Sequence, residues 1–311
     1  MYNKLLSRLI IYKLIIIFII IFFNFIIQNI VFADILRPLA VMIGNSPEEI
    51  IYQSGLNKAN IVYEVNVEYP FTRLMAIYLD SDSTIVGPIR SSRFYFSRLA
   101  TEWQSVFAHC GGQSLKDERM INLDEMYYSS PYWRDKNIGG WINLFSDTKN
   151  LREKSRKLGH SEKIQLGENI YALSTLNLSG GNISKITIKY HQKYSVYYEY
   201  IQDSNRYTRY INSKIHQDSK THEDISVSNV IIQYVPIEKV EGDKQGKLEV
   251  NVVGEGVAKV FYGGQYFLAK WIKKSKDQPT LLYDVHGNLL KLNKGETWIQ
   301  VVSEDTNVWI K

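Results

Sequence analysis

Short apolar runs alternate with turn-forming residues through the first half of the chain. Each run is rich in β-branched or other large apolar side chains and ends near Gly, Asn, Asp or Ser. Runs of this length and composition favour strands buried in the core of a sheet. We predict four such strands, at residues 38–43, 61–65, 73–78 and 106–109.

Two segments of this half have a helical rather than a strand pattern. Apolar residues recur at helical spacing across 91–105, directly after Gly87-Pro88, and Ser91 or Ser92 is placed to cap a helix there. Residues 147–158 are highly charged with few apolar positions, a pattern typical of a surface helix. The first half is therefore predicted to mix helices and strands.

The second half carries almost only strand patterns. Short alternating runs are separated by glycines and by turn-forming triplets such as the one at 203–205. Strands at this spacing suggest a β-sandwich or barrel-like sheet. The predicted strands are 186–190, 195–201, 207–211, 230–235, 247–253, 258–262, 266–271, 280–284, 289–292 and 297–302.

The change of pattern near residues 175–185 indicates the organisation of the chain. A segment that mixes helices with strands, followed by one made of strands, is typical of an α+β fold or of two domains. We predict a mixed α/β N-terminal domain with a central sheet at 34–178 and a β-rich C-terminal domain at 179–311.

The N-terminus has the composition of an export signal. Residues 14–31 are almost all apolar, no acidic residue occurs before Asp34, and three basic residues precede the run: Lys4, Arg8 and Lys13. A basic start, an apolar stretch and the small residue Ala33 describe a signal peptide, whereas a longer apolar stretch would describe a membrane anchor. Both alternatives place the remaining chain outside the cytoplasmic membrane, either secreted or anchored to its outer face.

Charge and cysteine content restrict the function further. Without the three basic residues of the N-terminus, 34 basic residues face 32 acidic ones, a balance that argues against a nucleic-acid-binding protein. Cys110 is the sole cysteine, so the exported body has no internal disulfide and its core alone must stabilise it. We find no nucleotide-binding or metal-ligand motif, and we expect no cofactor and no metal.

An ordered set of short motifs runs along both the N- and C-terminal parts of the chain. The most specific motifs are Ala-Asn-Ile-Val-Tyr-Glu at 59–64, Gly-Pro-Ile-Arg-Ser-Ser-Arg at 87–93 and His-Cys-Gly-Gly at 109–112. Further matches lie at 37–43, 53–56, 72–73, 133–135, 229–234, 254–256, 271, 279–280, 283–284 and 295–299.

This set of motifs resembles the YerB-like family of bacterial lipoproteins, in both its N- and C-terminal parts. The resemblance implies a fold and a location in the bacterial cell envelope, but it implies no reaction. The chain departs from the family in two places. It has no cysteine near residue 33 for lipid attachment, and Ile142 occupies a position where the family tends to have histidine.

Arginines are concentrated at one predicted helix start. Guanidinium groups bind phosphate or carboxylate through paired hydrogen bonds, and the amino end of a helix attracts anions. The candidate anion site consists of Arg73, Arg90, Ser91, Ser92 and Arg93. The alternative is that these arginines are neutralised within the fold by Glu64, Glu68 or Asp80.

Two other groups of residues are candidates for the same site. Glu64 and Glu68 have the spacing of one strand face and would form either a carboxylate pair or the counter-ions of the arginines. His109 would line the same cleft beside Gly111-Gly112, whereas Cys110 is expected to be a small core residue.

An aromatic loop supplies the last candidates. Trp133 and its neighbours would stack on sugar rings or on a protein partner, or would cover a sheet edge. Asp135 would fix Arg134 or reach the arginines.

We therefore expect a non-enzymatic envelope protein that binds an anionic cell-wall component or an envelope protein. An envelope enzyme acting on phosphate-linked or glycosidic wall polymers, with Glu64, Glu68 or Asp135 as acid or base, is the alternative. A structural adaptor of a membrane complex is a third hypothesis.

Overall fold

The computed structural model describes residues 35–311 except 69, 167–175 and 245. Ile35–Lys311 form one compact unit. The predicted signal peptide or anchor at 1–33 therefore lies outside the described residues. Among the residues that are described, no helix is long and apolar enough to cross a membrane.

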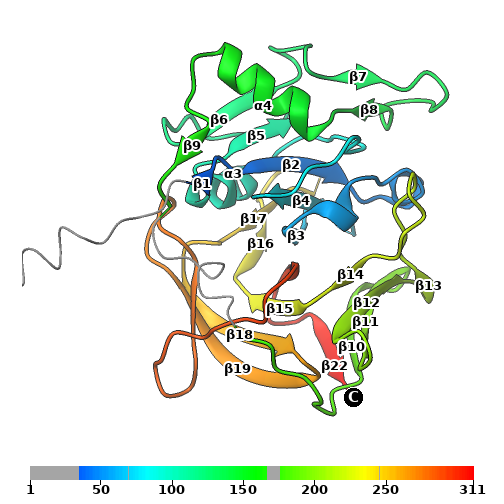
Figure 1. Ribbon diagram of the computed structural model, residues 1–311, viewed down its shortest axis with the longest axis vertical. Coiled ribbons are helices and arrows are strands. Elements are labelled where there is room, and N and C mark those ends of the chain that lie inside the picture. The colour runs from blue at the N-terminus through cyan, green and yellow to red at the C-terminus, as the bar shows by residue number, and fades with distance from the viewer. Residues whose placement is uncertain (1–34, 69, 167–175, 245) are drawn as a thin grey trace, which may run out of the picture. The chain divides into compact units, whose positions relative to one another are not determined.

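A ten-stranded mixed sheet forms the centre of this unit (Figure 1). Its strand order is β20-β19-β18-β15-β21-β3-β4-β2-β5-β6. The first half of the chain supplies β2 (Leu39–Gly44), β3 (Ile61–Asn66), β4 (Thr72–Tyr78), β5 (Val106–His109) and β6 (Ile121–Asp124). The second half supplies β15 (Asn229–Tyr234), β18 (Gly254–Tyr262), β19 (Gln265–Lys273), β20 (Leu281–Tyr283) and β21 (Thr297–Val302).

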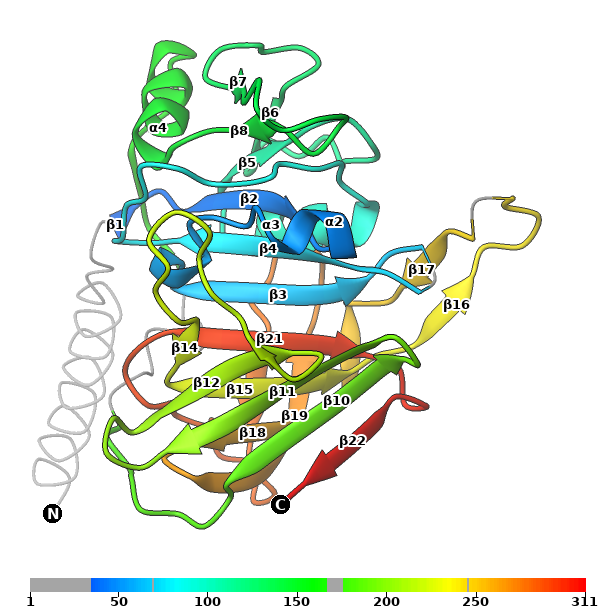
Figure 2. The same cartoon turned by 90° about the vertical axis from the view of Figure 1, so that its right-hand side faces the viewer.

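Strand β21 joins the two halves, because it lies between β15 and β3 and runs parallel to both (Figure 2). Its residues alternate between the two faces of the sheet, as strand geometry requires. Trp298 enters the core on one face, and Ile299 enters the core on the other. Both predicted domains thus contribute to one continuous sheet, and their division at residues 178 and 179 stays a prediction.

A six-stranded sheet covers one face of the large sheet (Figure 2). Inward-facing residues such as Ile186 and Tyr198 pack with Val62 and Trp298 of the large sheet. The strands of the smaller sheet are β10 (Lys185–His191), β11 (Tyr194–Ile201), β12 (Arg206–Ile211), β13 (Lys214–Ile215), β14 (Ser226–Val227) and β22 (Asn307–Ile310). The prediction of sandwich-like packing in the second half is consistent with this arrangement.

Few helices complete the fold. The two longest described helices are α3 (Phe94–Glu102), whose Phe96 and Leu99 join the core on the other face of the large sheet, and α4 (Thr148–Lys157). A short helix α2 (Pro47–Ile50) and a 3₁₀ turn η1 (Leu56–Lys58) follow β2. Three two-stranded ribbons pair β1 (Ile35–Leu36) with β9 (Lys163–Ile164), β7 (Trp133–Arg134) with β8 (Leu144–Phe145), and β16 (Ile237–Lys239) with β17 (Leu248–Val250).

The expected α+β class is correct in part, because the protein is mostly strands with a large mixed sheet and few helices. The helix predicted at 91–105 is shorter, and neither Ser91 nor Ser92 caps it, since Arg93 occupies the N-cap position. The helix predicted at 147–158 is confirmed, with the Asp147 side chain accepting a hydrogen bond from Asn150 N at 2.6 Å. The strand predicted at 289–292 is wrong: only a single bridge between Tyr283 and Leu289 occurs there.

Candidate functional site

The predicted anion site lies where parallel strands β2 and β5 end. The loop after Pro88 runs between the separating ends of these strands, with Arg90 N donating to Met42 O at 3.1 Å and Ser92 N donating to Gly111 O at 3.0 Å. Ligands of open sheets with parallel strands commonly bind at these carboxyl ends. The position of the loop is therefore favourable for a binding site.

Gly112 allows this loop to lie so close to the end of β5. Its φ of +85° suits glycine, and a Cβ atom at this position would stand 2.3 Å from the carbonyl oxygen of Ser92. Gly112 thus serves the close packing of the end of β5 against the arginine loop.

Arg73 and Arg93 share one carboxylate. Arg73 is only 9% exposed, and its Nη1 donates to Ser91 O at 2.9 Å and to Ser91 Oγ at 3.2 Å. Its Nη2 lies 3.9 Å from Glu68, and the Nη2 of Arg93 forms an ion pair with that same carboxylate. Ser92 is fully buried and supports the loop.

Arg90 has a carboxylate of its own and anchors a second loop. Its Nε lies 2.6 Å from Glu49 Oε1, and Glu49 also accepts a hydrogen bond from Ser46 N at 2.8 Å. The Nη1 of Arg90 donates to the carbonyl oxygen of Trp141 at 3.3 Å. We call Arg73, Arg90, Arg93, Glu49 and Glu68 the arginine cluster.

Three guanidinium groups face two carboxylates in the arginine cluster, so one positive charge is unmatched. Burial, and after it the charge of Arg93, lowers the pKa of Arg73 to about 10. The Nε of Arg93 is buried without a hydrogen-bond partner, and no side chain caps the amino end of α3. The predicted internal pairing is therefore real but incomplete, with Glu49 and Glu68 as the partners rather than Glu64 or Asp80.

Glu64 belongs to a different, fully buried network. Its Oε2 accepts from Arg209 Nη2 at 2.8 Å and from Gln300 at 3.0 Å, and its Oε1 accepts from Tyr194 at 2.6 Å. Burial acts to raise the pKa of this carboxyl, but the charge of Arg209 together with the hydrogen bonds from Tyr194, Gln300 and Arg209 holds the pKa below its ordinary value. The predicted pairing of Glu64 with Glu68 is wrong, because β3 ends at Asn66 and Glu68 lies in the following turn.

Arg209 and His216 are the residues that we did not identify from the sequence. The Nη1 of Arg209 lies 2.7 Å from Nδ1 of His216, whose Nε2 lies 2.6 Å from Gln53 Oε1. Burial, and after it the charge of Arg209, lowers the pKa of His216 well below its ordinary value. A neutral imidazole therefore accepts from the guanidinium and donates to Gln53. The network joins residues from both halves of the chain.

His109 does not line a cleft with the arginines, which corrects our expectation. It is fully buried, with Nδ1 3.0 Å from Gly111 O and Nε2 2.5 Å from Asn122 Oδ1. Cys110 is half-buried, and its thiol donates to Glu125 at 3.4 Å. Burial, reinforced by Glu125, raises the pKa of this thiol.

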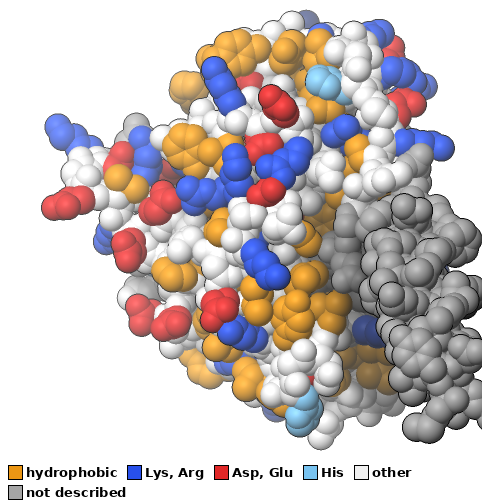
Figure 3. Space-filling view, turned by 90° about the vertical axis from the view of Figure 1, so that its left-hand side faces the viewer, with side chains coloured by type: hydrophobic (Ala, Val, Ile, Leu, Met, Phe, Trp, Pro, Cys, Tyr) orange, Lys and Arg blue, Asp and Glu red, His pale blue; other side chains and the backbone are white. Residues whose placement is uncertain are grey.

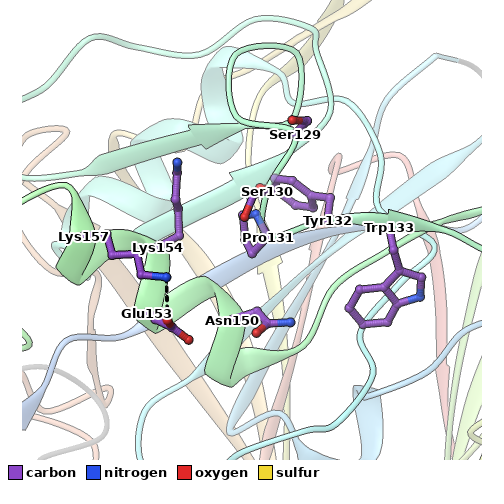
Figure 4. A pocket seen from close by; sticks show the side chains of 9 residues that line it. All are labelled: Ser129, Ser130, Pro131, Tyr132, Trp133, Asn150, Glu153, Lys154 and Lys157. Carbon is purple, nitrogen blue, oxygen red and sulfur yellow. Dashed lines mark ion pairs between the residues drawn. The ribbon is translucent and has the colours of Figure 1, made fainter.

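Trp133 is the predicted site residue that does line an open hollow. The hollow measures about 580 Å³ and lies between the segment 129–133 and helix α4 (Figure 4). From the helix, Asn150 and Lys154 face the hollow, and Lys154 also lies over the ring of Tyr128 at 5.0 Å. Lys157 pairs with Glu153 at 2.7 Å.

The other two residues of the aromatic loop have local roles. Arg134 is exposed and pairs with Glu125 at 3.1 Å, so Asp135 does not fix it. The carboxylate of Asp135 instead accepts from Asn137 N at 2.9 Å, within its own turn. The expectation that Asp135 fixes Arg134 or reaches the arginines is therefore wrong.

The surface charge of the described residues is mixed. On the face in Figure 3, Lys and Arg side chains are interspersed with Asp and Glu rather than gathered in one broad basic surface. Within the described ranges, no group of three His, Cys, Asp or Glu residues has the arrangement of a metal site.

Comparison with known proteins agrees with the resemblance in the motifs. Residues 33–161 match the N-terminal domain, and residues 186–299 the C-terminal domain, of the family described as protein of unknown function (DUF3048). The chain is 26% identical over 280 residues to the Bacillus subtilis protein named "Putative lipoprotein YerB", covering 86% of this chain and 82% of that protein.

The fold is also similar to a solved structure. The crystal structure of YerB from Bacillus subtilis superposes with a TM-score of 0.76 at 24% identity, covering 88% of this chain and 94% of the other. The strand-rich architecture is thus shared, and the two matched domains span most of the sequence. The chain therefore belongs to the YerB-like (DUF3048) family.

Proposed function

We propose that this protein binds an anionic group of a cell-envelope component, a phosphate or a carboxylate, at the arginine cluster. The observation that carries the proposal is the unmatched positive charge among three guanidinium groups and two carboxylates. An anion there would complete the charge balance and accept hydrogen bonds from Arg93 and from the uncapped amino end of α3.

The relative named a lipoprotein supports a place outside the cytoplasmic membrane, as does the basic and apolar N-terminus. The ligand would then come from the envelope. The arrangement favours binding over catalysis, because Glu64 is fully buried with Arg209 and Asp135 serves a local turn.

Titration calorimetry with inorganic phosphate and with isolated wall polymer fragments tests the proposal. Arg93→Ala leaves Glu68 paired with Arg73, so the fold is retained, and we expect binding to weaken roughly tenfold or more. Arg93→Lys should recover only part of it, since Lys lacks the planar fork.

Arg206→Ala is the matched control. Arg206 is partly exposed and pairs with Glu296 at 2.7 Å, as Arg93 pairs with Glu68, but it lies on the six-stranded sheet. Binding that is absent, or equally weak in the Arg93 and Arg206 variants, would overturn the proposal.

The hollow beside Trp133 is a second candidate place for the same class of ligand. An indole ring facing an ammonium group and an amide suits an anionic sugar. Trp133→Ala should weaken binding of wall fragments but not of inorganic phosphate. Equal binding of the fragments by the variant and the original protein would exclude this place.

A further inference from the structure

Exposed apolar side chains surround the arginine cluster. Trp141 is 83% exposed, Tyr127 80% and Met126 72%, while Phe71 and Phe94 are exposed by 43% and 37%. Apolar side chains gathered at one place on the surface are a mark of an interaction site, whereas single ones are ordinary. We call these five residues the apolar rim.

Contacts in the fold tie the apolar rim to the cluster. Trp141 follows two glycines, and its carbonyl oxygen accepts from Arg90. Phe71 N donates to Glu68 O at 2.7 Å, so Phe71 lies in the same turn as the carboxylate shared by Arg73 and Arg93.

The remaining three rim residues border the arginine loop. Phe94 directly follows Arg93 as the first residue of α3. Met126 contacts Gly111, whose carbonyl oxygen accepts from Ser92 N, and Tyr127 is next to Met126. The rim residues therefore come from four separate segments of the chain around one positively charged centre.

This combination has the chemistry of a surface that meets a bilayer. Trp and Tyr prefer the boundary between headgroups and acyl chains, and cationic side chains are attracted to anionic headgroups. An exposed apolar surface stabilises binding in proportion to the area that leaves water. The charge of the cluster matches a phosphate headgroup, and the apolar rim matches the layer beneath it.

We infer that this surface docks onto the anionic outer leaflet of the membrane. Trp141, Tyr127 and Met126 enter the headgroup boundary, and the arginine cluster contacts lipid phosphates. The apolar N-terminal segment ends shortly before the first strand at Ile35, so an uncleaved segment would keep the body near a membrane. The inference rests on the proposed anion binding and names phospholipid phosphate as the group bound.

Vesicle sedimentation tests the inference with the body of residues 35–311. This part is a unit by itself, and the similar crystal structure covers 88% of the chain, so it can be studied without the N-terminus. We expect it to bind vesicles that contain phosphatidylglycerol and not vesicles of phosphatidylcholine alone. Trp141→Ala combined with Tyr127→Ala should weaken binding about tenfold or more, because both side chains are almost fully exposed.

Trp309→Ala is the control, since Trp309 is 53% exposed on β22 in the six-stranded sheet, and it should bind like the original protein. Brominated phosphatidylglycerol should quench tryptophan emission, and Trp141→Phe should remove most of that quenching. Sedimentation that does not depend on phosphatidylglycerol, or that the rim variant and Trp309→Ala alter equally, would overturn the inference.

Two outcomes show how this inference and the proposed function can be told apart. A rim variant that still binds dissolved glycerol phosphate but no longer binds vesicles supports both. A protein that binds dissolved phosphate through Arg93 but never binds anionic vesicles keeps the proposed function and rejects the membrane surface.

Discussion

Replacing Glu64 by glutamine should destabilise the protein severely, although the two side chains have nearly the same shape. Glu64 and Arg209 are both fully buried, so the variant leaves a guanidinium charge without its counter-ion inside the core. Breaking a buried ion pair by removing one partner costs about 3–5 kcal/mol. The total stability of a domain is about 5–15 kcal/mol, so this change is a large share of it.

The hydrogen bonds around Glu64 lead to the same magnitude. Oε2 accepts from Arg209 and Gln300, and Oε1 accepts from three donors, Asn45, Thr72 and Tyr194. An amide NH₂ in place of Oε2 faces two groups that only donate, Arg209 and Gln300, and loses both hydrogen bonds. In place of Oε1 it loses the hydrogen bond from Asn45, and the hydroxyls of Thr72 and Tyr194 must turn to accept. A lost bond to a charged group costs about 1.5–3 kcal/mol and a neutral one about 1 kcal/mol.

Urea unfolding followed by tryptophan fluorescence measures the effect as a free energy of unfolding. Glu223→Gln is the control, because Glu223 pairs with Lys58 at the solvent-exposed surface and the loss of this pair should change the free energy of unfolding little. Arg209→Met placed in the Glu64→Gln background should cost less than it does alone. A loss below about 1 kcal/mol for Glu64→Gln would refute the argument that the buried charge pair governs this core.

Three further outcomes follow from single residues. Because the pKa of His216 is low in the folded state, only the unfolded chain gains a proton as pH falls below about 6.5, so the free energy of unfolding should decrease by up to about 1.4 kcal/mol per pH unit. Urea midpoints at pH 7.5 and 5.5 should differ, and His216→Gln should reduce the difference. The same pH dependence of the midpoint in the variant and the original protein would contradict a neutral, buried His216. Gly112→Ala should lower the thermal midpoint, because its Cβ would meet the Ser92 carbonyl; an unchanged midpoint argues against that contact. Cys110 should react slowly with a thiol reagent at pH 8, since its pKa is raised, and a rate equal to that of a free cysteine would contradict this.

Local patterns predicted most of the individual elements correctly. The apolar runs at β2, β3 and β4 are buried along their whole length or nearly so, and such runs differ clearly from turns. Helix α4 was identifiable from the Asp147 cap and its charged pattern. The place of β21 between β15 and β3 was not predictable. Strand order depends on contacts between segments distant in sequence, and the hydrophobic pattern of a strand does not reveal which other strand it pairs with.

The candidate site was predicted in part. As predicted, the loop after Pro88, which carries Arg90 and Arg93, lies beside Arg73, because the Arg73 side chain donates to Ser91 in that loop. Of the counter-ions of these arginines, Glu68 was predicted correctly. Glu49 was missed, because it lies on the short helix α2, whose position beside Arg90 does not follow from any sequence spacing. Arg209 had a usable pattern: it alternates with Tyr207 and Ile211 on the inner face of β12, so a buried cation in need of a partner was indicated there.

The position of β21 determines when the chain can finish folding. This strand begins at Thr297, close to the C-terminus, yet both β3 and β15 depend on it for their parallel pairing. Without β21, β3 and β15 each keep one unpaired edge, because β4 and β18 pair only with their other edges. The large sheet can therefore close only after β21 has joined it, and until then these two apolar strands can pair with other chains.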